Sequence, residues 1–136
     1  MEVMMSKEKH KKTNALRILD THKIPYSISE YEWSEERAAG LHVVEALKLD
    51  EKQVFKTLVG KGDKTGYVVF CIPVAEELDM KQAACVSHNK SVELVHVKDL
   101  LSITGYLRGG CSPVGMKKAF PTYFDATMEP QKFVYV

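Results

Sequence analysis

The chain has 136 residues, of which 45% are hydrophobic and 27% charged, and its formal net charge is +1. A chain of this size can bury the core of one domain, whereas its charge excludes a protein that binds nucleic acid through a strongly basic surface alone. No apolar run approaches the roughly 20 residues of a membrane-spanning helix, and the charged N-terminus lacks the apolar stretch of a signal peptide.

The cysteines and histidines predict a reduced protein without a metal. Cys71, Cys85 and Cys111 form no CxxC pair and are odd in number, which favours the reducing cytoplasm over a disulfide framework. Cys85 and His88 are the nearest approach to a metal-binding pair, but a zinc site normally needs four ligands. We therefore expect no metal and no cofactor.

The N-terminal third predicts a tail followed by alternating helices and strands. The lysine-rich residues 1–12 are expected to form a flexible tail, with the folded domain over residues 13–136. Thr13 is a good N-cap for a helix that reaches about residue 21. Alternating side chains predict a strand over residues 26–32, and apolar spacing predicts a second helix over about 36–47.

A hairpin is predicted at the centre of the chain. VFKTLVG (54–60) and YVVFCI (67–72) read as antiparallel strands joined by the turn KGDKTG, and Pro73 ends the pairing. Asp79 is a suitable N-cap for a helix over about residues 80–86.

The C-terminal part continues the alternation. A short strand is predicted over residues 91–95, followed by a helix that ends at Gly105, a residue suited to the left-handed conformation beyond a helix. PTYFDA and KFVYV (132–136) read as two more strands. Together these elements predict a single α/β or α+β domain with a mixed, mainly antiparallel sheet packed against helices.

Lys56 is the residue whose position is hardest to explain by packing. Both faces of its strand are mostly apolar, so the strand is expected inside the sheet, where a lysine is costly unless its ammonium reaches a pocket or a partner. A cation there can hold a phosphate or stabilise a leaving alkoxide. The alternative is a lysine whose stem packs while its head reaches water.

The glycine-rich segment TGYLRGGCSPVG (104–115) is the second candidate. Gly109 and Gly110 lack a Cβ and would let a ligand approach the backbone, with the Ser112 hydroxyl beside them. The segment matches no standard phosphate-binding motif, so spacing alone favours a plain surface loop. Cys111 would need a base or a positive field to act as a nucleophile, and a small buried cysteine is the simpler interpretation.

Tyr31 and Asp125 each stand at the end of a predicted strand. Tyr31 is suited either to hydrogen-bond a ligand or to lie as an ordinary tyrosine at an interface. Asp125 is a candidate carboxylate, although aspartates at strand ends usually form turns.

Four segments follow one another along the chain: IPYSISEYE, VFKTLV, CIPVAEELDMKQAA and TGYLRGGCSPVGMKKAFPTYFDA. Together and in this order, they resemble the YbaK/EbsC family from about Ala15 to Val136. The last segment is the most specific, since family members carry a similar TGYL-x-GG-x-SP-x-G motif. The resemblance implies the fold of free-standing aminoacyl-tRNA editing proteins, which is shared by an inserted domain of bacterial prolyl-tRNA synthetases.

The resemblance also implies residue roles. Lys56 matches the main functional lysine, and Thr57 follows it in the KT pair. Tyr31 matches the tyrosine at a strand end, and the backbone of Gly109 helps to bind the aminoacyl group. Gly110 and Ser112 match the same side of the binding pocket as Gly109. Cys111 stands where relatives tend to have an aliphatic residue, which supports its reading as a small apolar filler.

The implied activity is that of a trans-editing deacylase, of the hydrolase or lyase type, that clears mischarged Cys-tRNA(Pro). In such enzymes the thiol of the substrate attacks its own ester, so the protein supplies no nucleophile. The implied partners are the mischarged tRNA and, as a further candidate, prolyl-tRNA synthetase, with neither DNA nor a membrane involved. The open alternatives are a deacylase for alanine or serine, and a non-catalytic module that binds tRNA or the synthetase.

The chain departs from the family at its C-terminus. Family members continue past the strand that matches KFVYV into a further strand with a pocket aspartate and a final helix. No residue here matches that aspartate, and Asp125 does not align with it. We therefore expect residues 13–136 to form a C-terminally shortened editing domain.

Overall fold

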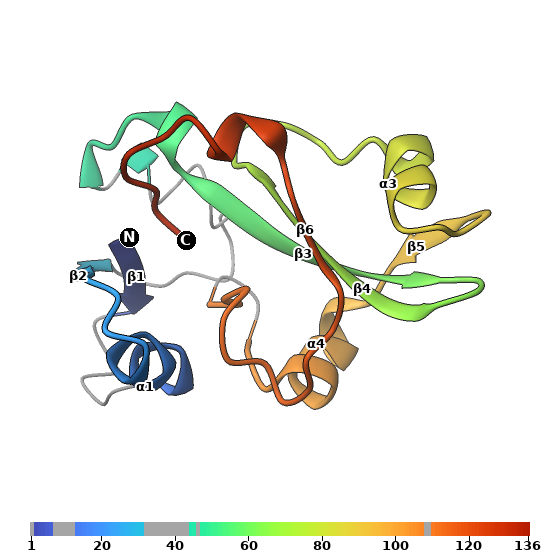
Figure 1. The fold of residues 1–136 in the computed structure, drawn as a ribbon, viewed down its shortest axis with the longest axis horizontal. Helices are drawn as coiled ribbons and strands as arrows, with labels where there is room; N and C mark the ends of the chain where they lie inside the picture. Colours follow the sequence, from blue (N-terminus) through green and yellow to red (C-terminus); the bar gives the residue numbers. More distant parts are fainter. Residues whose placement is uncertain (1, 7–12, 32–43, 46, 108–109) are drawn as a thin grey trace.

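The computed structural model describes residues 2–6, 13–31, 44–45, 47–107 and 110–136 (Figure 1). Short strands and helices alternate along most of this part of the chain. In chain order the elements are β1 (Glu2–Ser6), α1 (Asn14–Thr21), β2 (Ser27–Tyr31), η1 (Glu51–Gln53), β3 (Phe55–Gly62), β4 (Gly66–Pro73), α3 (Met80–Val86), β5 (Val92–Leu94), α4 (Val97–Thr104), β6 (Thr122–Phe124) and η2 (Ala126–Met128).

The main sheet has four strands in the order β5-β3-β4-β6. β3 and β4 form the predicted hairpin, in antiparallel register from Phe55 opposite Pro73 to Gly62 opposite Gly66. β5 pairs antiparallel with the end of β3, and β6 runs parallel to β4. The predicted mixed, mainly antiparallel sheet is therefore confirmed, and β3 is an interior strand as expected for the strand that carries Lys56.

The predicted helix boundaries are confirmed where the structure describes them. Thr13 caps α1 by accepting a hydrogen bond from the Leu16 backbone N–H at 3.3 Å. Asp79 caps α3 in the same way, accepting from two backbone N–H groups of its first turn at 3.1 Å each. α4 ends at Gly105, whose φ of +85° is the left-handed conformation that glycine adopts most readily. The helix predicted over residues 36–47 lies largely outside the described residues.

The N-terminus differs from the expected flexible tail. Glu2–Ser6 form β1, which pairs parallel with β2 from Glu2 opposite Ser27 to Ser6 opposite Tyr31. The reason is the edge of β2, whose backbone hydrogen-bonding groups can accept another strand. Lysine-rich composition alone gave no sign of this pairing, because it depends on a strand more than 20 residues away in the chain.

The expected C-terminal strand KFVYV is also corrected. Within residues 132–136 the structure has a single parallel bridge, between Tyr135 and Val54, and no extended strand. Two backbone hydrogen bonds accompany it, from Phe55 N–H to the Tyr135 carbonyl at 3.0 Å and from Tyr135 N–H to the Gln53 carbonyl at 2.8 Å. The β-branched and aromatic residues favour a strand here, but their composition does not determine whether a neighbouring strand offers an edge to pair with.

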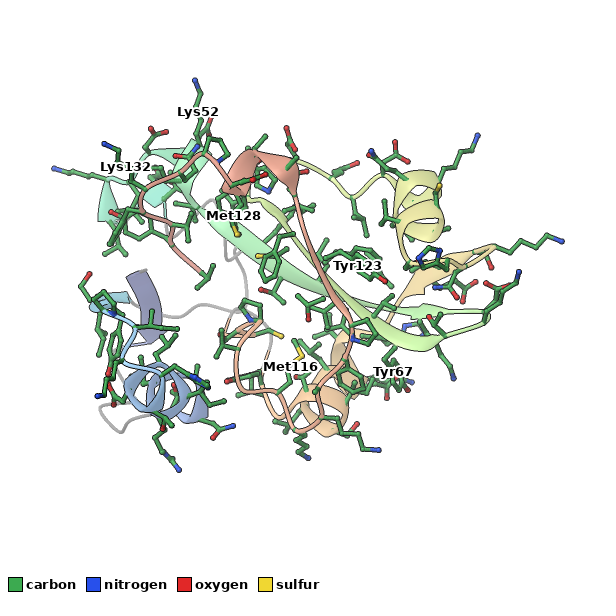
Figure 2. The ribbon with its side chains drawn as sticks, viewed as in Figure 1. Lys52, Tyr67, Met116, Tyr123, Met128 and Lys132 are labelled. Atoms are coloured by element: carbon green, nitrogen blue, oxygen red, sulfur yellow. The ribbon has the colours of Figure 1, made fainter. Side chains whose placement is uncertain are left out.

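The two faces of the hairpin are packed against different elements. On one face, Val68 and Phe70 pack with Ala83 and Ala84 of α3 and with Val92. The other face carries Tyr67, whose ring meets that of Phe120 edge-on, with centroids 5.7 Å apart. Figure 1 shows α3 and α4 on opposite sides of the hairpin, and Figure 2 shows Tyr123 on the α3 side and Tyr67 on the α4 side.

Asn89 ties the hairpin turn to the connection after α3. Its side-chain oxygen accepts from the backbone N–H groups of Lys64 and Thr65, both at 3.0 Å, while its amide donates to the hydroxyls of Thr65 and Ser87, both at 2.9 Å. The residue is 9% exposed. A Cβ placed on Gly62 would lie 2.3 Å from this amide, so only glycine fits there.

We expect Asn89→Ala to lower the free energy of unfolding by about 1–3 kcal/mol, because it removes the partners of several turn groups at once. Urea unfolding followed by circular dichroism measures the loss. Lys90→Ala is the matched control, since it changes the exposed neighbour and removes none of these bonds. Equal stability of the two variants would contradict a structural role for the Asn89 side chain.

Candidate functional site

Lys56 lies on β3 directly opposite Ile72 of β4 and is half-buried. Successive side chains of a strand point to opposite faces, so Lys56 shares its face with Phe70 and Ile72, the face that α3 covers further along the hairpin. Thr57 therefore points to the other face. The two residues of the KT pair are thus brought to the same end of the hairpin but not to the same side of it.

Lys56 stands near the start of β3, where the last residues of the chain lie alongside. Val54, two positions before it, is fully buried and bridges to Tyr135. Lys52 and Lys132, both exposed, lie at this end of the molecule as well (Figure 2). This end of the sheet therefore gathers cations from segments that are far apart in the sequence.

Thr57 lies opposite Cys71, which is fully buried at the centre of the sheet. Burial raises the pKa of the Cys71 thiol to about 12, an effect that hydrogen bonding by the Thr57 side chain partly offsets and the nearby Cys111 increases. The interaction between the two cysteines places Cys111 of the glycine-rich segment on the Thr57 face of the hairpin. This face thus brings together β3, β4 and the glycine-rich segment.

Cys111 has the character of a filler and not of a nucleophile. Burial raises the pKa of its thiol to about 11, and a side-chain hydrogen bond with Thr104 offsets only part of that rise. The thiol is therefore protonated at neutral pH, whereas a nucleophilic cysteine needs a thiolate. Its half-buried position agrees with a small apolar filler.

The glycine-rich segment is a loop held at both ends. At its base the Lys117 N–H donates to the Thr104 carbonyl at 3.0 Å. Further in, the Tyr106 hydroxyl donates to the Val114 carbonyl at 2.7 Å. The Ser112 hydroxyl oxygen accepts from the Val114 N–H at 3.1 Å, which sets the turn around Pro113. The described backbone of the segment, residues 104–107 and 110–115, is therefore shaped by specific bonds.

The predicted glycines are described only in part. Gly110 is exposed, its N–H donates to the Leu107 carbonyl at 3.0 Å, and a Cβ there would meet only that carbonyl, at 3.7 Å. The space around Gly110 is thus open enough for a ligand to approach. Gly109 lies outside the described residues.

The loop also docks on the start of α1. The Asn14 side-chain amide donates to the Gly115 carbonyl at 3.0 Å. Gly115 has a φ of +79°, and a Cβ there would lie 2.9 Å from the Ala15 nitrogen and 3.0 Å from the Tyr106 hydroxyl. Only glycine permits this approach. A pocket of about 350 Å³ lies at this junction, lined by Thr13, Asn14, Thr104, Gly105, Tyr106, Gly115 and Lys117.

Tyr106, Asn14 and Cys71 were not singled out in the sequence. Cys71 could have been found from the hairpin register, because Thr57 and Cys71 are placed opposite each other once the turn is known. Tyr106 and Asn14 carry no local signal, since their partners lie 8 and 101 positions away.

Tyr31 is the last residue of β2 and pairs with Ser6 of β1, as the prediction of a strand-end tyrosine requires. The position of its side chain lies outside what the structure describes. Asp125 forms a turn, as expected of a strand-end aspartate: its carboxylate accepts from the Thr127 N–H at 3.1 Å and so caps η2.

The described residues contain no group of three or more histidine, cysteine, aspartate or glutamate side chains placed to hold a metal ion. None of the helices within the described ranges is long and apolar enough to cross a membrane.

Sequence comparison identifies relatives over most of the chain. Residues 36–136 match the model of the family described as "Aminoacyl-tRNA editing domain". The chain is 52% identical over 120 residues to an Enterococcus faecalis protein named "Putative Cys-tRNA(Pro)/Cys-tRNA(Cys) deacylase EbsC". That alignment covers 88% of this chain and 73% of the relative.

Solved structures share the fold at lower identity. One, described as a "putative trans-editing enzyme for prolyl tRNA synthetase", has a TM-score of 0.68 and 21% identity, over 89% of this chain and 77% of its own. Another, described as the hypothetical protein APE2540, has a TM-score of 0.76 and 18% identity, over 88% and 78%. At these identities the likeness concerns the fold.

Proposed function

Because the chain belongs to the aminoacyl-tRNA editing domain family, in its YbaK/EbsC branch, we propose that it is a trans-editing deacylase that clears Cys-tRNA(Pro). The observation that carries the choice of substrate is the 52% identity to EbsC, whose name specifies cysteinyl-tRNAs. Proline enzymes mischarge cysteine because a cavity cannot strongly reject an apolar group of similar size, so an editing step is required.

The proposed reaction uses the thiol of the substrate. The sulfur attacks the ester carbonyl of the cysteinyl group, a carbon–sulfur bond forms, and the bond from that carbon to the ribose oxygen breaks. The thiol proton ends on the ribose hydroxyl, and the product is a cyclic cysteine thiolactone that water then opens. Holding the thiol and the ester together supplies much of the rate, because the reaction is intramolecular.

The protein then needs a positive charge and a binding surface that fits the substrate, and it needs no nucleophile of its own. We assign Lys56 to the terminal nucleotide, where its charge stabilises the departing ribose oxygen. Because Lys56 and the glycine-rich segment meet opposite faces of the hairpin, the proposal requires the substrate to pass around the Phe55–Pro73 end of the hairpin to contact both. Tyr31, Thr57, Gly109, Gly110 and Ser112 are assigned to substrate binding. The protonated thiols of Cys71 and Cys111 support a mechanism in which neither of these two cysteines attacks the ester.

The proposed tRNA contact is local, because a net charge of +1 gives little general attraction to nucleic acid. The exposed Lys52 and Lys132 lie at the Lys56 end of the sheet and are suited to contact phosphates near the tRNA terminus (Figure 2). Prolyl-tRNA synthetase, which releases the mischarged tRNA, is the proposed protein partner in the cytoplasm.

Loss of labelled cysteine from Cys-tRNA(Pro) tests the function. Deacylation well above the spontaneous rate is expected, while Pro-tRNA(Pro) is expected to stay charged. Ala-tRNA(Pro) and Ser-tRNA(Pro), assayed in parallel, reveal a different amino-acid preference. Binding of an aminoacyl-adenosine analogue without turnover of any of these substrates would overturn the proposal in favour of a binding module.

A further inference from the structure

Tyr106 bridges the two sides of the glycine-rich segment. Its hydroxyl donates to the Val114 carbonyl at 2.7 Å, across the stretch that contains Gly110 and Ser112. Its own N–H donates to the Thr104 hydroxyl at 3.0 Å, and that hydroxyl donates to the Leu100 carbonyl at 2.8 Å. A continuous chain of bonds thus runs from α4 through Tyr106 to the far side of the loop.

The same hydroxyl stands where the loop meets α1. A Cβ on Gly115 would lie 3.0 Å from it, and the carbonyl of Gly115 accepts from the Asn14 amide at 3.0 Å. The Tyr106 side chain is half-buried, and burial raises the pKa of its phenol, with the nearby Cys111 as the second cause. The hydroxyl therefore stays a protonated donor at neutral pH.

We propose that Tyr106 is a positioning residue of the editing site, which holds the glycine-rich segment in the shape in which Gly110 and Ser112 receive the aminoacyl group. This role rests on the proposed function. Two contacts hold the described part of the loop around the exposed Gly110: the Tyr106 phenol bonds to the Val114 carbonyl, and the start of α1 bonds to Gly115. Where catalysis depends on holding two reacting groups together, movement of the binding surface lowers the reaction rate.

Tyr106→Phe tests the role, because it removes the hydroxyl and keeps the ring. Tyr67→Phe is the matched control: it removes a hydroxyl from a half-buried tyrosine on β4 and keeps the ring contact with Phe120. Both variants and the wild type are assayed for kcat and KM with Cys-tRNA(Pro), and for hydrogen exchange of the backbone amides over residues 110–115.

For Tyr106→Phe we expect kcat to fall about tenfold, with less than about a twofold change in KM, which corresponds to the loss of one buried hydrogen bond or slightly more. Amide exchange over residues 110–115 is expected to rise several-fold, while exchange in β3 and β4 stays unchanged. Tyr67→Phe is expected to match the wild type in all of these. A purely structural defect would instead raise exchange throughout the sheet.

The kinetic and exchange measurements distinguish an error in the role of Tyr106 from an error in the proposed deacylase function. An unchanged kcat in Tyr106→Phe, or unchanged exchange over residues 110–115, overturns the positioning role while the deacylase assignment stands. A wild-type chain inactive on every tested tRNA overturns the proposed function and, with it, the role of Tyr106 in editing. In that case faster loop exchange in the variant would still establish the tether itself.

Discussion

Replacing Lys56 with alanine is expected to lower the deacylation rate of Cys-tRNA(Pro) at least about a hundredfold, the scale of losing one charge-stabilising group at a reacting centre. The residue is half-buried on an interior strand, opposite the buried Ile72, where a lysine has no packing advantage over an apolar side chain. The cost of placing a cation there is explained if the ammonium meets the tRNA terminus. Label release under single-turnover conditions measures the effect.

Lys61→Ala is the control for Lys56→Ala. Lys61 is on the same strand but exposed, and its ammonium lies 5.5 Å from the ring centre of Tyr67. It also removes one positive charge, so a general loss of attraction for tRNA would affect both variants alike. Thermal unfolding establishes that both variants fold. Full activity in Lys56→Ala would identify Lys56 as a lysine whose stem packs while its head reaches water.

Removing the thiol of the substrate is expected to have an equally large effect. If the thiol is the nucleophile, tRNA(Pro) charged with S-methylcysteine lacks the attacking group, and its deacylation should fall to the spontaneous rate. We expect a loss of at least about a hundredfold, given the advantage of an intramolecular nucleophile. The side chain also grows by one methyl group, and exclusion of such a group by a pocket is by itself worth about tenfold to two hundredfold, so a second analogue that adds no volume is needed.

Ser-tRNA(Pro) is the matched second substrate, because it exchanges sulfur for oxygen without adding volume. Slow turnover of both analogues supports attack by the thiol. Turnover of either at the rate of Cys-tRNA(Pro) would show that water is the nucleophile and that the enzyme is a direct hydrolase. A chain that prefers serine or alanine would move the substrate assignment while leaving the family unchanged.

The family was identified from short motifs, and the reason lies in what those motifs encode. VFKTLV and TGYLRGGCSPVG combine residues that are costly or conformationally special, such as Lys56 on an interior strand and glycines at close approaches. The comparisons confirm that resemblance. The substrate roles of Lys56, Thr57, Tyr31 and the glycines remain predictions.

The sequence by itself determined the elements whose signals are local. Thr13, Asp79 and Gly105 mark helix ends because a cap needs only neighbouring backbone groups, and the β3–β4 hairpin follows from two alternating runs around a short turn. Tertiary structure alone decided the pairing of β1 with β2, the single bridge at Tyr135, and the docking of Gly115 on Asn14. It also decided what meets each face of the hairpin, with α3 on the Lys56 side and the glycine-rich segment on the Thr57 side. Such contacts join residues far apart in the chain, and their stability depends on which surfaces remain to be covered after the local elements form.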